Sequence, residues 1–149
     1  MVVQTLEALS ALYETDETAW LEAMAELIQK GRYDQLDHSH LAEYLSDMAK
    51  RDRREVQSRL ATLIAHLRKW TYQPANRTRS CQGTIVDQRF ELEGLLESGV
   101  LHNHALAVLP RVNSQGVQRA VAETGLPAET FPAECPYTLE QLLTSQLSN

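Results

Sequence analysis

The chain has few of the residues that mark disulfide-rich or membrane-spanning proteins. Its 149 residues include two cysteines, Cys81 and Cys135, which are too few for a disulfide framework. No run approaches the roughly 18 consecutive apolar residues of a membrane-spanning helix. The first residues lack the cationic start and apolar run of a signal peptide. We therefore expect a protein of the reducing cytoplasm with no membrane span.

The sequence also lacks the short motifs that identify many enzymes and metal proteins. It contains no CxxC, no HExxH, no glycine-rich phosphate loop and no GxSxG. The pairs His38/His40 and His102/His104 are two residues apart, so on a helix their side chains point to nearly opposite sides and cannot share a metal. Cys81 falls on an apolar helix face, where a thiol is usually an inert core residue. The sequence therefore predicts no metal site and no cofactor, and it disfavours a nucleophilic cysteine.

Basic residues are concentrated in the middle of an acidic chain. The net charge is −6, yet residues 50–89 hold ten of the fourteen lysines and arginines against three acids, a net charge of +7. Residues 1–49 and 90–149 carry −8 and −5. Such a partition suits a site for an anionic partner, and it also suits ion pairing between the middle and its flanks. We favour ion pairing.

Helical periodicity dominates the chain. With 43% hydrophobic residues, it can bury the core of one domain over residues 1–149. Apolar residues recur at helical spacing, most clearly over residues 52–72, and no run alternates long enough to indicate a strand. Pro74 ends this helix, and a short turn leads to a helix at 80–98 that Gly99 closes. We predict an all-α fold, a compact helical bundle of about five to seven helices with a central antiparallel helical hairpin.

Local signals place the other helices. They are expected at residues 4–12, before Gly31, after Asp37, at residues 101–124 and after Thr138. Gly31 is read as a helix stop and Asp37 as an N-cap. Thr138 and Gln141 match a capping box. Pro110 should break or kink the helix at 101–124.

The candidate site is a group of polar side chains in the predicted hairpin. A polar stripe runs along one edge of the apolar face of the 52–72 helix, and Gln88 and Arg89 project from within the apolar face of the next. A buried amide and guanidinium need partners. We therefore predict one polar cluster, made of His66, Lys69, Gln73, Arg77, Arg79, Thr84, Gln88 and Arg89. It is either an open site or a buried network that fixes helix packing, and we favour the network.

The basic middle also has features of a nucleic-acid surface. Its bases are interleaved with aromatic residues: Arg68, Lys69, Arg77 and Arg79 with Trp70 and Tyr72. However, Trp70 falls on the apolar stripe, and the acidic remainder of the chain would repel a polyanion. Nucleic acid is therefore disfavoured as a partner and left open.

Several motifs resemble one bacterial family. They lie at residues 33–37, 53–55, 66–74, 84–89 and 131–139. Over almost the whole chain they are similar to the family called domain of unknown function 29, which is common in cyanobacteria. The resemblance implies a compact helical bacterial protein with no established activity and no catalytic residues to carry over. The family pattern usually has tryptophan at the position of Cys81 and a glycine near Met48; the missing glycine favours a continuous helix across residues 37–72.

The molecular activity is unknown from the sequence, and whether the chain is an enzyme is undecided. We predict a non-enzymatic helical interaction or regulatory module, with another protein or a second copy of the chain as partner. The alternative is an anion-handling protein, either nucleic-acid binding or a small hydrolase or transferase, that uses the basic polar cluster of residues 66–89.

Overall fold

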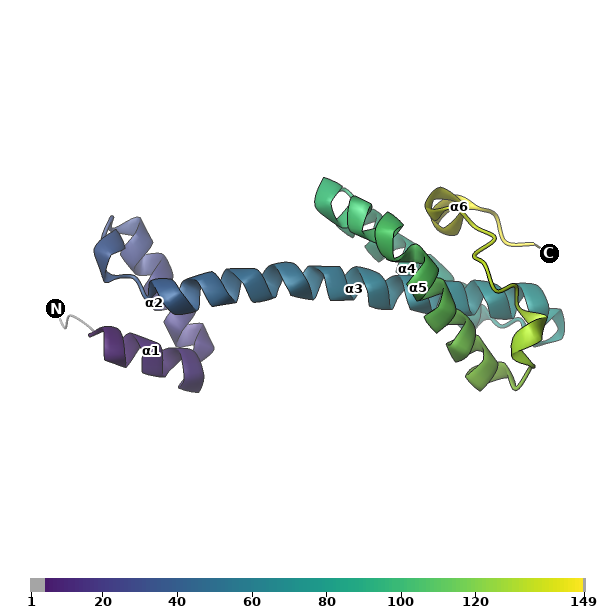
Figure 1. Cartoon of the computed structure of the whole chain (residues 1–149), viewed down its shortest axis with the longest axis horizontal. Helices are drawn as coiled ribbons and strands as arrows, with labels where there is room; N and C mark the ends of the chain where they lie inside the picture. The colour runs from purple at the N-terminus through teal and green to yellow at the C-terminus, as the bar shows by residue number, and fades with distance from the viewer. Residues whose placement is uncertain (1–4, 149) are drawn as a thin grey trace. The chain divides into compact units, whose positions relative to one another are not determined.

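The structure is a computed structural model that describes residues 5–148 (Figure 1). This part of the chain forms six α-helices and three 3₁₀ helices and no strand, which confirms the all-α prediction. The chain divides into two compact units, unit 1 at residues 1–50 and unit 2 at residues 51–149, and each is described by itself. The single-domain organisation stays a prediction.

Unit 1 contains α1 (Leu6–Thr15), α2 (Glu17–Gln29), the 3₁₀ helix η1 (Tyr33–Gln35) and the start of α3. Its small core consists of Leu9, Trp20, Met24 and Leu36. Lys30 and Gly31 follow α2, and Gly31 has a φ of +70°, which glycine adopts without strain. The predicted helix stop is therefore confirmed.

Asp37 is a buried carboxylate at the start of α3 (His38–Tyr72). Its Oδ1 accepts the backbone N–H of His40 at 3.5 Å, which confirms the predicted N-cap. Its Oδ2 accepts hydrogen bonds from Trp20 Nε1 at 3.2 Å and Ser10 Oγ at 3.3 Å, and lies 2.7 Å from His40 Nδ1. One carboxylate thus ties three elements of unit 1 together.

α3 is a single helix of 35 residues that belongs to both units. Two separate helices were predicted here, and the structure corrects this: the sequence between them contains no glycine or proline, so nothing interrupts the backbone hydrogen bonds. A continuous helix is also what the sequence favours, because this chain lacks the glycine that the family pattern has near Met48. The apolar stripe is buried as predicted, from Val56 to Leu67. α3 ends at Tyr72, and Pro74 opens the 3₁₀ helix η2 (Pro74–Asn76).

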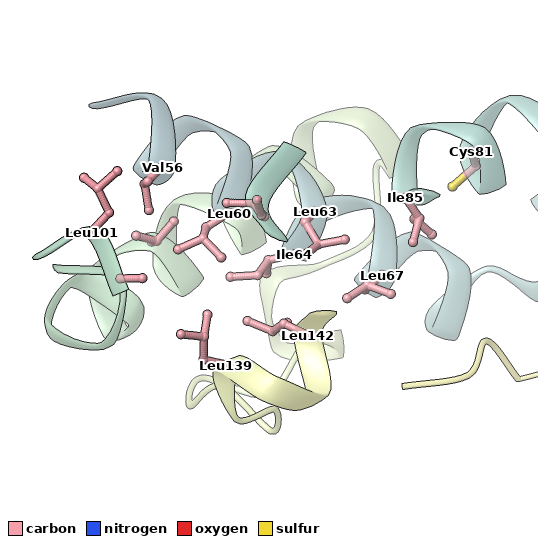
Figure 2. Packing of buried hydrophobic residues seen from close by; sticks show 13 residues of the cluster. Val56, Leu60, Leu63, Ile64, Leu67, Cys81, Ile85, Leu101, Leu139 and Leu142 are labelled. Carbon is pink, nitrogen blue, oxygen red and sulfur yellow. The ribbon is translucent and has the colours of Figure 1, made fainter. Parts of the chain in front are cut away.

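Unit 2 packs the C-terminal part of α3 with α4 (Arg79–Leu95), α5 (Gly99–Thr124) and α6 (Leu139–Thr144). A third 3₁₀ helix, η3 (Ala128–Thr130), lies between α5 and α6. Figure 2 shows the core, in which leucine, isoleucine and valine side chains from all four α-helices meet. None of the helices within residues 5–148 has an apolar stretch long enough to cross a membrane.

α3 and α4 form the predicted antiparallel hairpin. His66 contacts Cys81 and Arg59 contacts Gln88, so contacts advance along α4 as they go back along α3. Because the connection through η2 is short, α4 has to run back along α3 in the antiparallel direction.

The bounds of α5 differ from the prediction in two respects. Gly99 opens α5 and does not close the preceding helix, because the Ser98 hydroxyl accepts the N–H of Leu101 at 3.3 Å and acts as the N-cap. The helix also continues through Pro110 without the predicted break, with Ala105 and Val112 on either side fully buried in the core; a kink at Pro110 stays a prediction. Packing on both sides of the proline holds the helix despite the lost hydrogen bond.

The predicted capping box at the start of α6 is confirmed. Gln141 N donates to Thr138 Oγ1 at 3.1 Å, and Thr138 N donates to Gln141 Oε1 at 3.0 Å. The helix places Leu139 and Leu142 in the core of unit 2.

Candidate functional site

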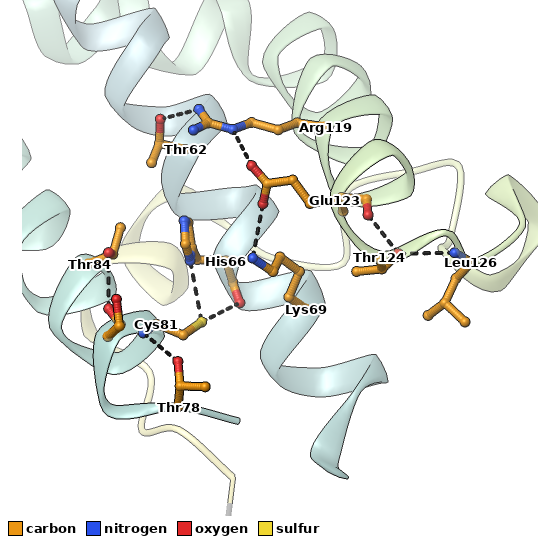
Figure 3. Close-up of polar contacts among 12 residues, drawn as sticks. Thr62, His66, Lys69, Thr78, Cys81, Thr84, Arg119, Glu123, Thr124 and Leu126 are labelled. Atoms are coloured by element: carbon orange, nitrogen blue, oxygen red, sulfur yellow. Dashed lines mark hydrogen bonds and ion pairs between the residues drawn. The ribbon is translucent and has the colours of Figure 1, made fainter. Parts of the chain in front are cut away.

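The side of α3 that faces α5 carries a chain of polar contacts (Figure 3). Lys69 Nζ lies 2.9 Å from Glu123 Oε2, Arg119 Nε lies 3.1 Å from Glu123 Oε1, and Arg119 Nη1 donates to Thr62 Oγ1 at 2.8 Å. The hydrogen bond from Lys69, together with the one from Arg119, holds the pKa of Glu123 below its usual range although partial burial opposes this. Lys69 is therefore paired with an acid from the C-terminal flank, the kind of pair that the charge partition predicts.

Where α3 faces α4, the histidine His66 of α3 lies against the thiol Cys81 of α4. His66 Nδ1 lies 3.3 Å from Cys81 Sγ, which is 3.9 Å from the carbonyl oxygen of His66. Burial, and then the charge of Lys69, lowers the pKa of His66, while burial raises the pKa of the Cys81 thiol. Both shifts favour the neutral forms at neutral pH. A nucleophilic cysteine acts as a thiolate, so this pair is not arranged as an activated nucleophile.

A cleft of about 340 Å³ lies where the end of α3, η2 and the start of α4 meet the end of α5. Its lining residues are mostly polar: Lys69, Trp70, Gln73, Asn76, Arg77, Thr78, Cys81, Glu123 and Thr124. Arg77 is held by the chain, since its Nε donates to the carbonyl oxygen of Trp70 at 2.9 Å and its guanidinium lies 5.0 Å from the centre of the Trp70 ring. The cleft thus contains two cations with internal contacts, one carboxylate and several neutral donors.

The structure gathers three of the eight predicted site residues, Lys69, Gln73 and Arg77, around this cleft and disperses the others. Thr84 donates to a carbonyl of its own helix, that of Ser80. Gln88 accepts a hydrogen bond from Arg59. These two residues therefore stabilise α4 and its contact with α3.

The two remaining arginines of the predicted cluster differ in their contacts. Arg89 Nε donates to the carbonyl oxygen of Leu142 at 2.8 Å and its Nη2 to Ser145 Oγ at 3.4 Å, at the end of α6. Burial lowers the pKa of Arg89. Arg79 is the first residue of α4 and is exposed, and within residues 5–148 its side chain makes no hydrogen bond or ion pair. Arg89 is structural, whereas Arg79 is available to a partner.

Arg68 is fully buried, which corrects its assignment to a nucleic-acid surface. Its Nη2 donates to Asn113 Oδ1 at 2.8 Å and to the carbonyl oxygens of Pro132 at 3.3 Å and Glu134 at 3.4 Å. It therefore fixes the segment after η3 to the core and cannot reach a phosphate. The signal for this was its position four residues after Ile64, which continues the apolar stripe.

A comparison with models of protein families shows which family the chain is related to. The family model described as domain of unknown function DUF29 matches residues 12–147. The chain belongs to this family. The resemblance that the sequence motifs carry is thereby confirmed, and the family description names no activity. No curated protein and no solved structure matches this DUF29 chain.

Within residues 5–148 of the DUF29 chain, no three His, Cys, Asp or Glu side chains are grouped so that they could hold a metal ion. Around the cleft, the charged groups of Lys69, Glu123 and Arg77 already have partners within the chain.

Proposed function

We propose that this DUF29 protein is a non-enzymatic helical interaction module whose partner binds the exposed face of α4. Phe90 and Val86 support this most directly: they lie one helical turn apart and are 73% and 58% exposed. The opposite face of the same helix buries Cys81, Ile85 and Leu92. α4 thus has one apolar surface in the core and a second one in solvent.

An exposed aromatic residue of this kind is more than ordinary surface. Single exposed apolar residues are common and need no explanation. Here a phenylalanine and a valine are neighbours at i and i+4, and glycines lie on either side of them, at Gly83 and Gly94. Aromatic residues near the centre of a patch contribute much of the energy of protein interfaces.

The polar residues support the non-enzymatic part of the proposal. Lys69 and Arg89 are occupied by contacts that hold α3 to α5 and α4 to α6. The lowered pKa of His66 and the raised pKa of Cys81 both favour the neutral side chains. The alternative, an anion-handling protein, has weaker support because the cleft that gathers the cations also contains Glu123. The proposal keeps the cytoplasmic location and bacterial origin expected from the sequence.

Photo-crosslinking tests this proposal. The crosslinking amino acid p-benzoylphenylalanine is placed at position 90, and at position 111 as a matched control, since Arg111 is exposed on α5. In cells of the source organism, position 90 should give one or a few discrete adducts that position 111 does not give. Adding Val86→Asp should reduce their yield. The absence of adducts at position 90, or the same adducts from both positions, would contradict the proposal.

A further inference from the structure

The exposed face of α4 has charged ends as well as an apolar centre. At 100° per residue, Arg79, Gly83, Val86, Phe90 and Gly94 fall within about 80° of arc, and we call these five residues the α4 face. Glu97 follows in the turn directly after the helix. The face therefore begins with a cation, ends beside an anion and is apolar or small between them.

The order of these residues is complementary to itself. If two α4 helices lie antiparallel with a two-fold axis near residue 88, Arg79 of each copy faces Glu97 of the other, and Val86 faces Phe90. In a parallel pair, Arg79 would face Arg79 and Glu97 would face Glu97, and both contacts would be repulsive. Within residues 5–148, the side chains of Arg79 and Glu97 make no hydrogen bond or ion pair that would have to break when the pair forms.

The glycine nearest the centre allows the two helices to approach closely. A Cβ atom added at Gly83 would have nothing within 4 Å, so the space above it is open. In the antiparallel pair, the Phe90 ring of one copy lies over Val86 and beside Gly83 of the other, because residues three and four apart share a helix face. Packed helix axes lie about 8–10 Å apart, and a small residue beside a ring favours the short end of this range.

We infer that the partner bound by the α4 face is a second copy of this chain, in an antiparallel and symmetric α4 pair. The inference rests on the proposed function and names its partner. One helix face is smaller than the roughly 800 Å² that each partner buries in a standard interface. The dissociation constant should therefore be on the order of micromolar, and the dimer should form and dissociate with concentration.

Charge reversal tests both the partner and the direction of pairing. The full chain is studied by sedimentation equilibrium from about 1 to several hundred micromolar, a range that brackets the expected dissociation constant. Arg79→Glu and Glu97→Arg each place like charges opposite one another, so each should weaken the dimer at least about tenfold. The double variant restores both pairs and should dimerise like the wild type. A mixture of the two single variants should form a heterodimer that neither forms alone.

The net charge makes Glu97→Arg the sharper variant. It changes the charge of the chain from −6 toward neutrality, so general repulsion between copies falls while the specific pair is lost. Arg111→Glu, a reversal on α5, is the control and should leave the dissociation constant within about twofold, since exposed charges at a distance are screened. Far-UV circular dichroism should show unchanged helix content in every variant.

The outcomes separate this inference from the proposed function. A wild-type chain that stays monomeric, or a dimer that the single reversals do not weaken, overturns the second-copy inference. If the chain is monomeric while the crosslinker at position 90 traps another protein, the interaction module stands and only its partner is different. If the chain is monomeric and position 90 gives no adduct, both are overturned.

Discussion

Replacing Gly116 by alanine tests the close contact between α5 and α3. A Cβ at this position would lie 2.6 Å from Ile64 Cγ2, 2.9 Å from Ile64 Cβ and 3.2 Å from the carbonyl oxygen of Ala61. Ile64 is fully buried and cannot turn away, so the two helices must separate. Overpacking of this kind costs about 1–3 kcal/mol. Alanine recovers at most about 1 kcal/mol through its helix propensity. We expect a net loss of about 1–2 kcal/mol in the free energy of unfolding.

Gly83→Ala, measured at a protein concentration well below the micromolar dissociation constant inferred for the α4 pair, is the matched control for this substitution. Gly83 also lies inside a helix, its φ is not positive, and nothing lies within 4 Å of its Cβ position. Alanine here gains helix propensity without a clash, so the free energy of unfolding should rise by about 0.5–1 kcal/mol. The same chemical change should therefore have opposite signs on α5 and α4, and only the contact with Ile64 explains the difference.

Urea titration followed by tryptophan fluorescence measures both variants. The chain has two tryptophans, Trp20 in unit 1 and Trp70 in unit 2, so a Trp20→Phe background makes the signal report unit 2. With a urea dependence of about 1–3 kcal/mol per molar, the midpoint of Gly116→Ala should fall by about 0.5–1 M. If Gly116→Ala is as stable as its parent while Gly83→Ala behaves as expected, the close packing of α5 on α3 is wrong.

Two further substitutions test the polar contacts of each unit. Burial acts to raise the pKa of Asp37, but hydrogen bonds, the strongest from His40, hold it below its usual range. Asp37→Asn should therefore lower the free energy of unfolding at pH 7. The difference from the wild type should shrink as the pH falls from about 4 through the lowered pKa of Asp37, because the carboxylate becomes protonated. A difference that does not change with pH would contradict the role of the charged carboxylate. Arg89→Ala leaves the Leu142 carbonyl without its donor and should cost about 1–2 kcal/mol in urea titrations. Arg111→Ala, exposed on α5, should change stability by less than about 0.5 kcal/mol.

Helices whose signals are local could be predicted from the sequence. The stripe from Val56 to Leu67 is spaced so that a helix buries all of it, and Thr138 with Gln141 defines a cap by itself. Glycine and proline indicate helix boundaries less reliably, because each residue suits more than one position at the start or the end of a helix. Gly99 fits the end of one helix or the start of the next, and Ser98 decides between them through a hydrogen bond to Leu101.

The partners of the polar residues could not be predicted, because they come from distant parts of the chain. The polar edge of α3 was found from its spacing, but Glu123, which pairs with Lys69, lies 54 positions later. Arg68 depends on Asn113 and on carbonyls of the segment after η3, and no local pattern indicates either. Charge partition predicts that acids and bases will pair, but only the crossing of α3 and α5 selects the pairs.

The contacts of unit 2 change which part of the basic middle is open to a partner. The predicted cluster contains four cations, and three of them, Lys69, Arg77 and Arg89, contact other parts of unit 2. Within residues 5–148 Arg79 is the one whose side chain makes no such contact, and it lies in line with Val86 and Phe90 on the exposed face of α4. A partner that pairs with the charge of Arg79 therefore also contacts Val86 and Phe90. On this face, that favours a helix with an acid at the matching position over a polyanion, which would meet one cation there and no favourable apolar contact.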